Sequence, residues 1–171
     1  MQRYEAEYLI PLLMTGFAFG GSCLPKDVRA LSCAARMCDL ELLLVYFLLP
    51  NNERVIQHAF AQVSGRKVRR IGMIGLSFKS DTDDLRESPL VKLAEHLLCK
   101  GYQLKIYDPN VSLAQVTGSN KEYTEKRIPH LSSLIISSVA EFSECQLMLI
   151  GHRYTNAEQF LKDTEIPSIY L

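Results

Sequence analysis

The chain has 171 residues, of which 47% are hydrophobic, and this is enough for one domain or for a small domain with extensions. Lys and Arg together number 19, as do Asp and Glu, so the charge indicates neither a nucleic-acid partner nor a disordered chain. The longest apolar run, residues 42–49, is far shorter than the roughly 20 residues that a membrane span requires. We therefore expect a globular protein with no nucleic-acid and no membrane partner.

Cysteines and histidines indicate neither a disulfide framework nor a metal site. The five cysteines are odd in number and lack a paired metal spacing, and the four histidines are scattered along the chain. No signal peptide is expected, because the N-terminus carries Glu5 and Glu7 without a cleavage site. A reduced, cytoplasmic compartment is the simplest interpretation.

The first part of the chain is predicted to be helical. Residues 1–15 match no regular element, and the glycine-rich loop that follows contains Phe17 and Phe19, which either line a pocket or only pack. Pro50 is expected to kink or restart the second helix. The apolar run before it is expected to be covered on all sides, by this chain or by a partner. The elements predicted here are a loop at 16–24 and helices at 25–38 and 41–64.

After a basic cluster at 66–70, the pattern changes to strands that alternate with helices. The cluster is interpreted as a solvated linker or, alternatively, as a binding patch. Alternation of this kind implies a parallel sheet with helices on both faces, which is an α/β fold. We place the domain boundary here, between 1–65 and 66–171. The expected strands are 71–76, 103–107, 131–136, 147–150 and 168–171, and the expected helices are 89–100, 139–144 and 156–162.

The segment 20–27, with the sequence GGSCLPKD, has the pattern of a reactive cysteine loop. Two glycines permit a tight backbone path, and Pro25 suits the first turn of a helix. Cys23 then lies just before a helix N-terminus, with Lys26 and Arg29 close in sequence. Helix dipole and cations both favour a thiolate, which is a nucleophile toward an aldehyde or acyl carbon. The alternative is a cysteine that is merely small and buried.

A second polar loop, residues 77–88, joins a buried strand to a helix that Ser88 is expected to cap. Open α/β sheets bind nucleotides at such loops. The loop lacks the G-x-G-x-x-G pattern, which disfavours a dinucleotide bound in the usual way. Lys79 and Arg86 suit a diphosphate; alternatively, Lys79 pairs with Asp83 or Asp84, and Arg86 with Glu87.

Asp108 follows the next predicted strand, where an acidic residue could meet a ribose. A turn formed by Asp108, Pro109 and Asn110 explains the same residues.

Together, the two loops resemble the UDP-glucose/GDP-mannose dehydrogenase family. The resemblance extends from about residue 16 to near the end of the chain. Further matches at 16–19, 120–123 and 128–130 resemble the GDP-mannose branch of that family in particular. The resemblance implies NAD-dependent oxidation of GDP-mannose, or a related nucleotide sugar, from primary alcohol to carboxylate in two hydride steps. It also implies a role in precursor synthesis for an alginate-type polysaccharide.

For the chemistry, the resemblance implies two catalytic residues. Cys23 would capture the aldehyde as a thiohemiacetal and later form a thioester, and Asp27 would handle the hydrolytic water.

For binding, the resemblance implies two sets of residues. Phe17, Gly20 and Lys79 would contact the nucleotide sugar, and Lys26 and Arg86 would face the cofactor.

The family's domain order implies that a helical, dimer-forming part precedes a Rossmann-like sugar-nucleotide domain. This chain contains no dinucleotide-binding half, so NAD binding and turnover are not expected from it alone, and a homodimer through the central helices is expected. The alternatives are a non-catalytic remnant that serves as an oligomerisation or nucleotide-sugar-binding module, or a portion of a UDP-glucose 6-dehydrogenase.

Overall fold

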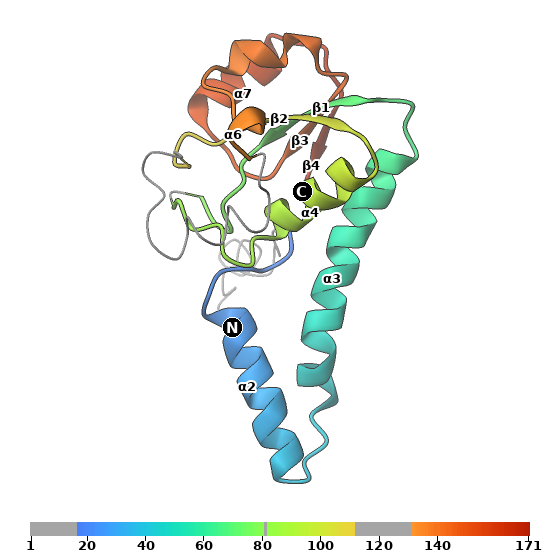
Figure 1. The fold of residues 1–171 in the computed structure, drawn as a ribbon, viewed down its shortest axis with the longest axis vertical. Coiled ribbons are helices and arrows are strands. Elements are labelled where there is room, and N and C mark those ends of the chain that lie inside the picture. Colours follow the sequence, from blue (N-terminus) through green and yellow to red (C-terminus); the bar gives the residue numbers. More distant parts are fainter. Residues whose placement is uncertain (1–16, 81, 112–130) are drawn as a thin grey trace, which may run out of the picture.

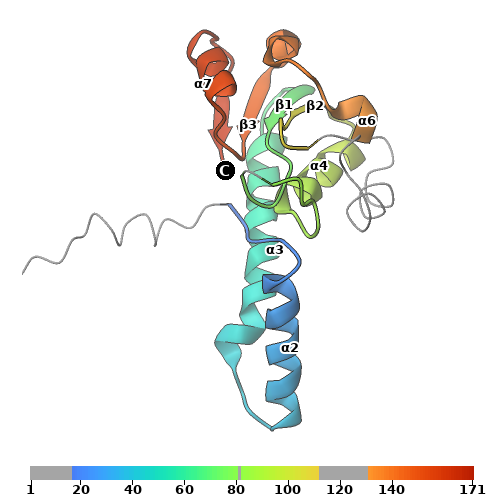
Figure 2. The ribbon, with the colours of Figure 1, turned by 90° about the vertical axis from the view of Figure 1, so that its left-hand side faces the viewer.

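The computed structural model describes residues 17–80, 82–111 and 131–171. Two long helices form a hairpin that extends away from an α/β unit (Figure 1). These are α2 (Leu24–Met37) and α3 (Leu43–Ser64), which lie side by side in both views (Figure 2). At the distal end, the Arg36 guanidinium lies 5.3 Å from the centroid of the Tyr46 ring, and the Tyr46 hydroxyl donates to the Leu40 carbonyl.

Pro50 lies inside α3, so the expected restart of the helix is wrong. Pro50 has no N–H to donate to the Tyr46 carbonyl one turn earlier, yet helical structure continues to Ser64. The second half of α3 explains this continuity, because Ile56, Ala59 and Val63 are buried in the core of the α/β unit.

All strands of the sheet run parallel, in the order β2-β1-β3-β4, which confirms the predicted α/β class. β1 and β2 are joined through α4 (Pro89–Cys99), whereas the chain after β2 crosses to the other side of β1. The carboxyl ends of β1 and β3 therefore form the topological switch point, where open sheets bind ligands. The strands are β1 (Arg70–Ile74), β2 (Gln103–Tyr107), β3 (Leu147–Ile150) and β4 (Ser168–Tyr170).

Helices cover both faces of this sheet (Figure 2). Side chains of β1 alternate between two cores: Ile71 and Met73 pack with α3 and α4, whereas Ile74 packs with the other face. On that second face lies Phe142, whose side chain is fully buried. The other helices in the described residues are α6 (Leu131–Leu134), a 3-10 helix η1 (Val139–Glu144) and α7 (Thr155–Lys162).

Residues 131–136 do not form the predicted strand. They begin with the short helix α6, and only Ile135 forms an isolated bridge, to Ile106 at the edge of β2. A short run of apolar residues and serines has no periodicity that separates helix from strand, so the sequence pattern could not decide between them.

The basic cluster at 66–70 leads into β1. The Arg70 Nε donates to the Glu144 carbonyl at 2.7 Å, and the backbone N–H groups of Arg69 and Arg70 donate to the Gln146 side chain. These contacts favour the linker interpretation over a binding patch.

Within the described residues, the apolar run before Pro50 is covered only in part. Exposed fractions are 60% at Leu43, 86% at Leu44 and 65% at Phe47. Of the two alternatives expected from the sequence, coverage by the described part of this chain is therefore incomplete, and coverage by a partner stays a prediction.

Candidate functional site

Cys23 is the residue immediately before the first turn of α2, as the sequence predicts, and it is exposed. Its side chain does not cap the helix, so its sulfur is not engaged with backbone N–H groups there. The Ser22 Oγ lies 3.8 Å from the Cys23 Sγ. Asp27 follows one turn later, where its N–H donates to the Cys23 carbonyl at 2.9 Å, so both residues share one side of the helix.

Asn52 of α3 fixes the start of the cysteine loop. Its Oδ1 accepts from the Phe19 N–H at 2.8 Å, and its Nδ2 donates to the Phe19 carbonyl, also at 2.8 Å. The Asn52 side-chain amide thus pairs with both the N–H and the carbonyl group of Phe19, as the backbone of a neighbouring β-strand would. Sequence reasoning missed Asn52, because no local pattern links it to a loop 33 residues earlier.

Two glycines let the cysteine loop lie directly against the loop that follows β1. The Gly21 N–H donates to the Arg86 carbonyl at 3.1 Å. A Cβ at Gly20 would overlap the Glu87 carbonyl oxygen and the Pro89 Cδ, and Gly21, with φ +82°, lies against the Phe78 ring. Glycine is therefore required at both positions because the backbones approach so closely.

Ion pairs form where the two loops meet. They differ from the Arg86–Glu87 pair that the sequence suggested as an alternative. Arg29 of α2 makes two 2.9 Å hydrogen bonds to Glu87, and these raise the pKa of Arg29. Arg86 pairs with Asp84 at 2.8 Å, rather than with Glu87. The hydrogen bond to Asp84 raises the pKa of Arg86.

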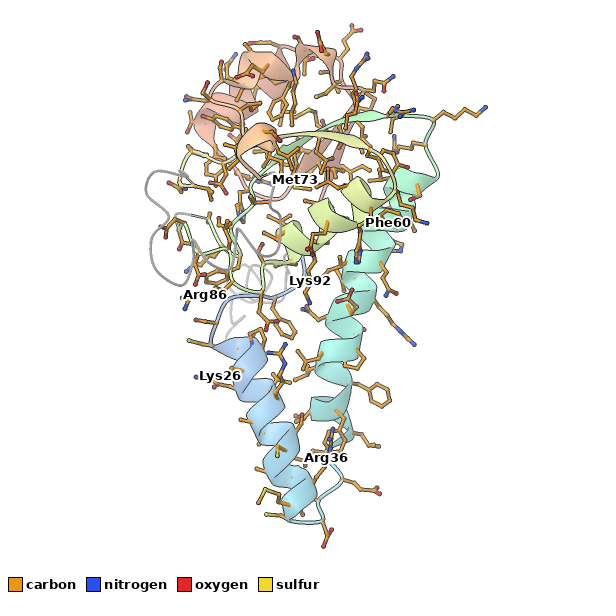
Figure 3. All side chains as sticks on the ribbon, in the orientation of Figure 1. Lys26, Arg36, Phe60, Met73, Arg86 and Lys92 are labelled. Atoms are coloured by element: carbon orange, nitrogen blue, oxygen red, sulfur yellow. The ribbon has the colours of Figure 1, made fainter. Side chains whose placement is uncertain are left out.

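The two cations that the sequence places near Cys23 are both close to carboxylates. Arg29 is paired with Glu87, and Lys26 lies 3.5 Å from Asp27. Lys26 and Arg86 lie on the same side of the molecule, one at the start of α2 and one on the loop above it (Figure 3).

A cleft of about 640 Å³ lies beside the cysteine loop, at the carboxyl ends of β1 and β3. Phe17 and Phe19 line it from the cysteine loop and Lys79 from the loop after β1, which favours the pocket interpretation of the two aromatic residues. Lys79 is exposed, and no ion pair of it is found within the described ranges, from which residue 81 is missing. The other lining residues are Ala18, Leu48, Asn51, Asn52, Val55, Phe78, Ser80, Pro89, Leu90, Gly151 and His152.

The strand ends below this cleft are closed by a buried polar network centred on Asp108. Its carboxylate accepts from the N–H groups of Leu76 and Ser77 and from the Tyr154 hydroxyl, at 2.8, 3.1 and 3.0 Å. The His152 Nε2 lies 2.9 Å from the Ser77 carbonyl oxygen. The turn interpretation of Asp108 is thus confirmed by its hydrogen bond from the Asn110 N–H, and the carboxylate is too buried to meet a ribose.

This network does not fit a dinucleotide at the switch point. The backbone N–H groups that could bind a pyrophosphate already donate to Asp108, and Gly75 lies under the His152 ring, with no room for a Cβ. Lys26 and Arg86 remain at the surface, where they could face a cofactor held by other residues.

Other expectations concern metals, membranes and masked residues. In the part of the chain that the structure describes, no group of three potential metal ligands is found, and no helix is long and apolar enough to span a bilayer. The motifs at 120–123 and 128–130, and residues 1–16, lie outside the described residues.

Comparison with known families matches residues 72–164 to the UDP-binding domain of the UDP-glucose/GDP-mannose dehydrogenase family. The chain is 55% identical to GDP-mannose 6-dehydrogenase of Pseudomonas aeruginosa over 138 residues, covering 80% of this chain and 32% of that protein. It is 37% identical to a UDP-glucose 6-dehydrogenase of Bacillus subtilis over 101 residues, covering 57% and 23%. The chain thus spans about a third of the length of the GDP-mannose 6-dehydrogenases that it matches.

Solved structures agree with this comparison. A ternary complex of GDP-mannose dehydrogenase from Pseudomonas aeruginosa matches with a TM-score of 0.80 and 46% identity, over 89% of this chain and 35% of that one. A UDP-glucose dehydrogenase from Pyrobaculum islandicum matches with a TM-score of 0.65 and 27% identity, over 85% and 32%. On the family match and these relatives, the chain belongs to the UDP-glucose/GDP-mannose dehydrogenase family.

Proposed function

We propose that this chain is the cysteine-loop and nucleotide-sugar-binding portion of a dehydrogenase that oxidises GDP-mannose to GDP-mannuronate. The observation that carries the proposal is the junction of the two loops: exposed Cys23 is held, through Gly21 and Arg86, against the loop that presents Lys79 to the cleft. GDP-mannose is preferred over UDP-glucose because the GDP-mannose relative has the higher identity, 55% against 37%.

In this proposal, Cys23 is the nucleophile. Its thiolate adds to the aldehyde carbon, which forms a C–S bond and, after proton uptake by the oxygen, a thiohemiacetal. Cys23 directly precedes the N-terminus of α2, where the helix dipole favours negative charge. After oxidation to the thioester, water would attack the acyl carbon, with Asp27 as general base and the thiolate as leaving group.

Dehydrogenases of this family are NAD-dependent, and NAD would accept the hydrides when bound. Because the switch point is closed by Asp108, we propose that the described residues do not hold the dinucleotide themselves. Lys26 and Arg86 would face a cofactor carried by another domain or subunit, so the isolated chain would be inactive.

Nucleotide-sugar binding is assigned to the cleft. Lys79 would pair with the diphosphate, Phe17 would contact the substrate, and Gly20 would keep the loop close to it. A thermal-shift experiment tests this assignment: GDP-mannose should raise the melting temperature, UDP-glucose should raise it less, and NAD should leave it unchanged. Lys79→Ala should remove most of the GDP-mannose shift, whereas Lys162→Ala on α7 should retain it. Absence of any GDP-mannose shift would overturn the assignment.

A homodimer through α2 and α3 is the second part of the proposal. The exposed Leu43, Leu44 and Phe47 side chains favour it, because a contiguous apolar surface of this kind commonly marks an interface. The same surface also favours the alternative of a non-catalytic oligomerisation module.

Sedimentation tests the dimer. We expect a dimer for the natural chain and a monomer for Leu44→Asp, whereas Tyr170→Asp, which alters an exposed residue of β4, should leave the dimer intact. A natural chain that stays monomeric at micromolar concentration would contradict the dimer.

A cytoplasmic location and a role in alginate-type polysaccharide synthesis complete the proposal. None of the five cysteines forms a disulfide, which fits a reducing compartment. The proposed role in polysaccharide synthesis depends on GDP-mannuronate being the product of the reaction.

A further inference from the structure

Asp108 is a buried carboxylate that reaches across the ends of neighbouring strands. It directly follows β2 and is only 3% exposed. No Lys, Arg or His within the described ranges forms an ion pair with it. A buried charge without a counter-ion is costly unless hydrogen bonds replace water, and here donors from three places in the chain do so.

The two carboxylate oxygens serve different segments. Oδ1 accepts from the Asn110 N–H and from the Tyr154 hydroxyl, which follows β3. Oδ2 accepts from the N–H groups of Leu76 and Ser77, at 2.8 and 3.1 Å, just after β1. One oxygen thus anchors the carboxylate, and the other fixes the backbone turn that begins the Lys79 loop.

Ser77 carries this constraint to Lys79. Its side chain is fully buried, and its Oγ donates to the Lys79 carbonyl at 2.8 Å. The same Oγ lies 3.2 Å from the Asp108 Oδ2, and the His152 Nε2 contacts the Ser77 carbonyl from the β3 side. The backbone at Lys79 is therefore held from within the protein, whereas its ammonium group is exposed to the cleft.

We propose that Asp108 is a positioning residue for Lys79. By holding the 76–79 turn, Asp108 sets the place at which the ammonium enters the cleft, so that the charge is placed before a nucleotide diphosphate arrives. This inference rests on the proposed function, because it assigns Asp108 to the same binding site. A loop that is ordered before the nucleotide binds increases the affinity, because no binding free energy is then spent on ordering the loop.

Asp108→Asn tests the inference with almost no change in volume. An amide has one oxygen and one NH2 group, so it cannot satisfy both sets of donors. Loss of the negative charge also weakens the hydrogen bonds that Leu76 and Ser77 can still donate to the remaining oxygen. A buried donor without an acceptor is energetically costly. We expect the 76–79 turn to loosen and the affinity for GDP, measured by calorimetry on the full chain, to fall about tenfold.

A double-mutant cycle separates positioning from general loss of stability. If Asp108 acts through Lys79, the Lys79→Ala variant should bind GDP weakly, and adding Asp108→Asn should weaken it no further. Phe142→Leu, a core change on the other face of the sheet, is the matched control: it should lower the melting temperature without changing the affinity for GDP. Independent effects of Asp108→Asn and Lys79→Ala that simply add would overturn the inference.

Hydrogen exchange supplies a measurement that does not depend on nucleotide binding. The Leu76 and Ser77 amides should exchange slowly in the natural chain and rapidly in Asp108→Asn, while the Gly21 amide, which donates to Arg86, should be unaffected. Unchanged protection at Leu76 and Ser77 would overturn the positioning role even if GDP binds. Loss of protection in Asp108→Asn together with no GDP binding by the natural chain would instead overturn the proposed function, and with it the role in binding.

Discussion

At the scale of single residues, Gly20 shows how closely the two loops meet. Gly20→Ala would place a methyl group against the Glu87 carbonyl and the Pro89 ring, and backbone atoms cannot move aside as a flexible side chain can. We expect a loss of about 1–3 kcal/mol in the free energy of unfolding, which is typical of overpacking. Chemical denaturation measures it.

Gly65→Ala is the control for this prediction, because the nearest atom to a Cβ there lies 3.7 Å away. It should be neutral or slightly stabilising. Equal effects of the two substitutions would show that the loops separate readily.

The Asp84–Arg86 pair makes a prediction that depends on pH. Burial of Asp84 acts to raise its pKa, but hydrogen bonds from the Arg86 side chain and backbone, together with the guanidinium charge, outweigh it and lower the pKa. A carboxyl group with a lowered pKa in the folded state stabilises the protein above its unfolded pKa of about 3.9 and loses this effect as the pH falls through the folded value. Asp84→Asn should therefore be less stable than the natural chain at pH 7.

Urea unfolding measures this difference, which should be constant between about pH 5 and pH 8 and should shrink below about pH 4. Asp163→Asn, a change at an exposed residue after α7, should show a much smaller difference at pH 7. A stability gap for Asp84→Asn that grows toward low pH would contradict the assigned shift.

At the scale of elements, α3 is a helix that tolerates an internal proline. Because Pro50 leaves the Tyr46 carbonyl without its helical donor and is itself exposed, Pro50→Ala should stabilise the chain by as much as about 3 kcal/mol. Thermal unfolding with circular dichroism measures the gain.

Pro25→Ala serves as the comparison, since Pro25 lies in the first turn of α2, where no helical donor is lost. It should bring no gain. A lower stability of Pro50→Ala would mean that Pro50 makes a packing contact of its own.

Which elements could be predicted depended on whether the signal was local. Ser88 was recognised as a cap from sequence and accepts from the Leu90 and Val91 N–H groups, and Cys23 was correctly placed at the start of a helix. Pairings between distant segments gave no such signal. Asn52 and Asp108 act on backbone groups more than 30 residues away. The Arg86–Asp84 pair joins residues only two apart, but it depends on how their loop folds.

At the scale of the whole molecule, the helical hairpin and the α/β unit share a core. The proposed boundary at residue 65 follows the change in sequence pattern, yet Ile56 and Val63 of α3 are fully buried against the sheet domain. This shared packing explains how a cysteine loop near one end of the described chain is held against a strand-end loop about 60 residues later. Sequence periodicity identifies the helices and strands of each unit, but it carries no information about contacts between the two units.

The central claim is that Cys23 is a reactive thiol beside a nucleotide-sugar cleft, and site-resolved alkylation tests it most directly. With iodoacetamide and mass spectrometry, Cys23 should react faster than exposed Cys33, Cys38 and Cys99, and Cys145 should react most slowly, because burial raises its pKa. GDP-mannose should slow labelling at Cys23 alone. Equal rates at the exposed cysteines, with no protection of Cys23 by GDP-mannose, would contradict the account.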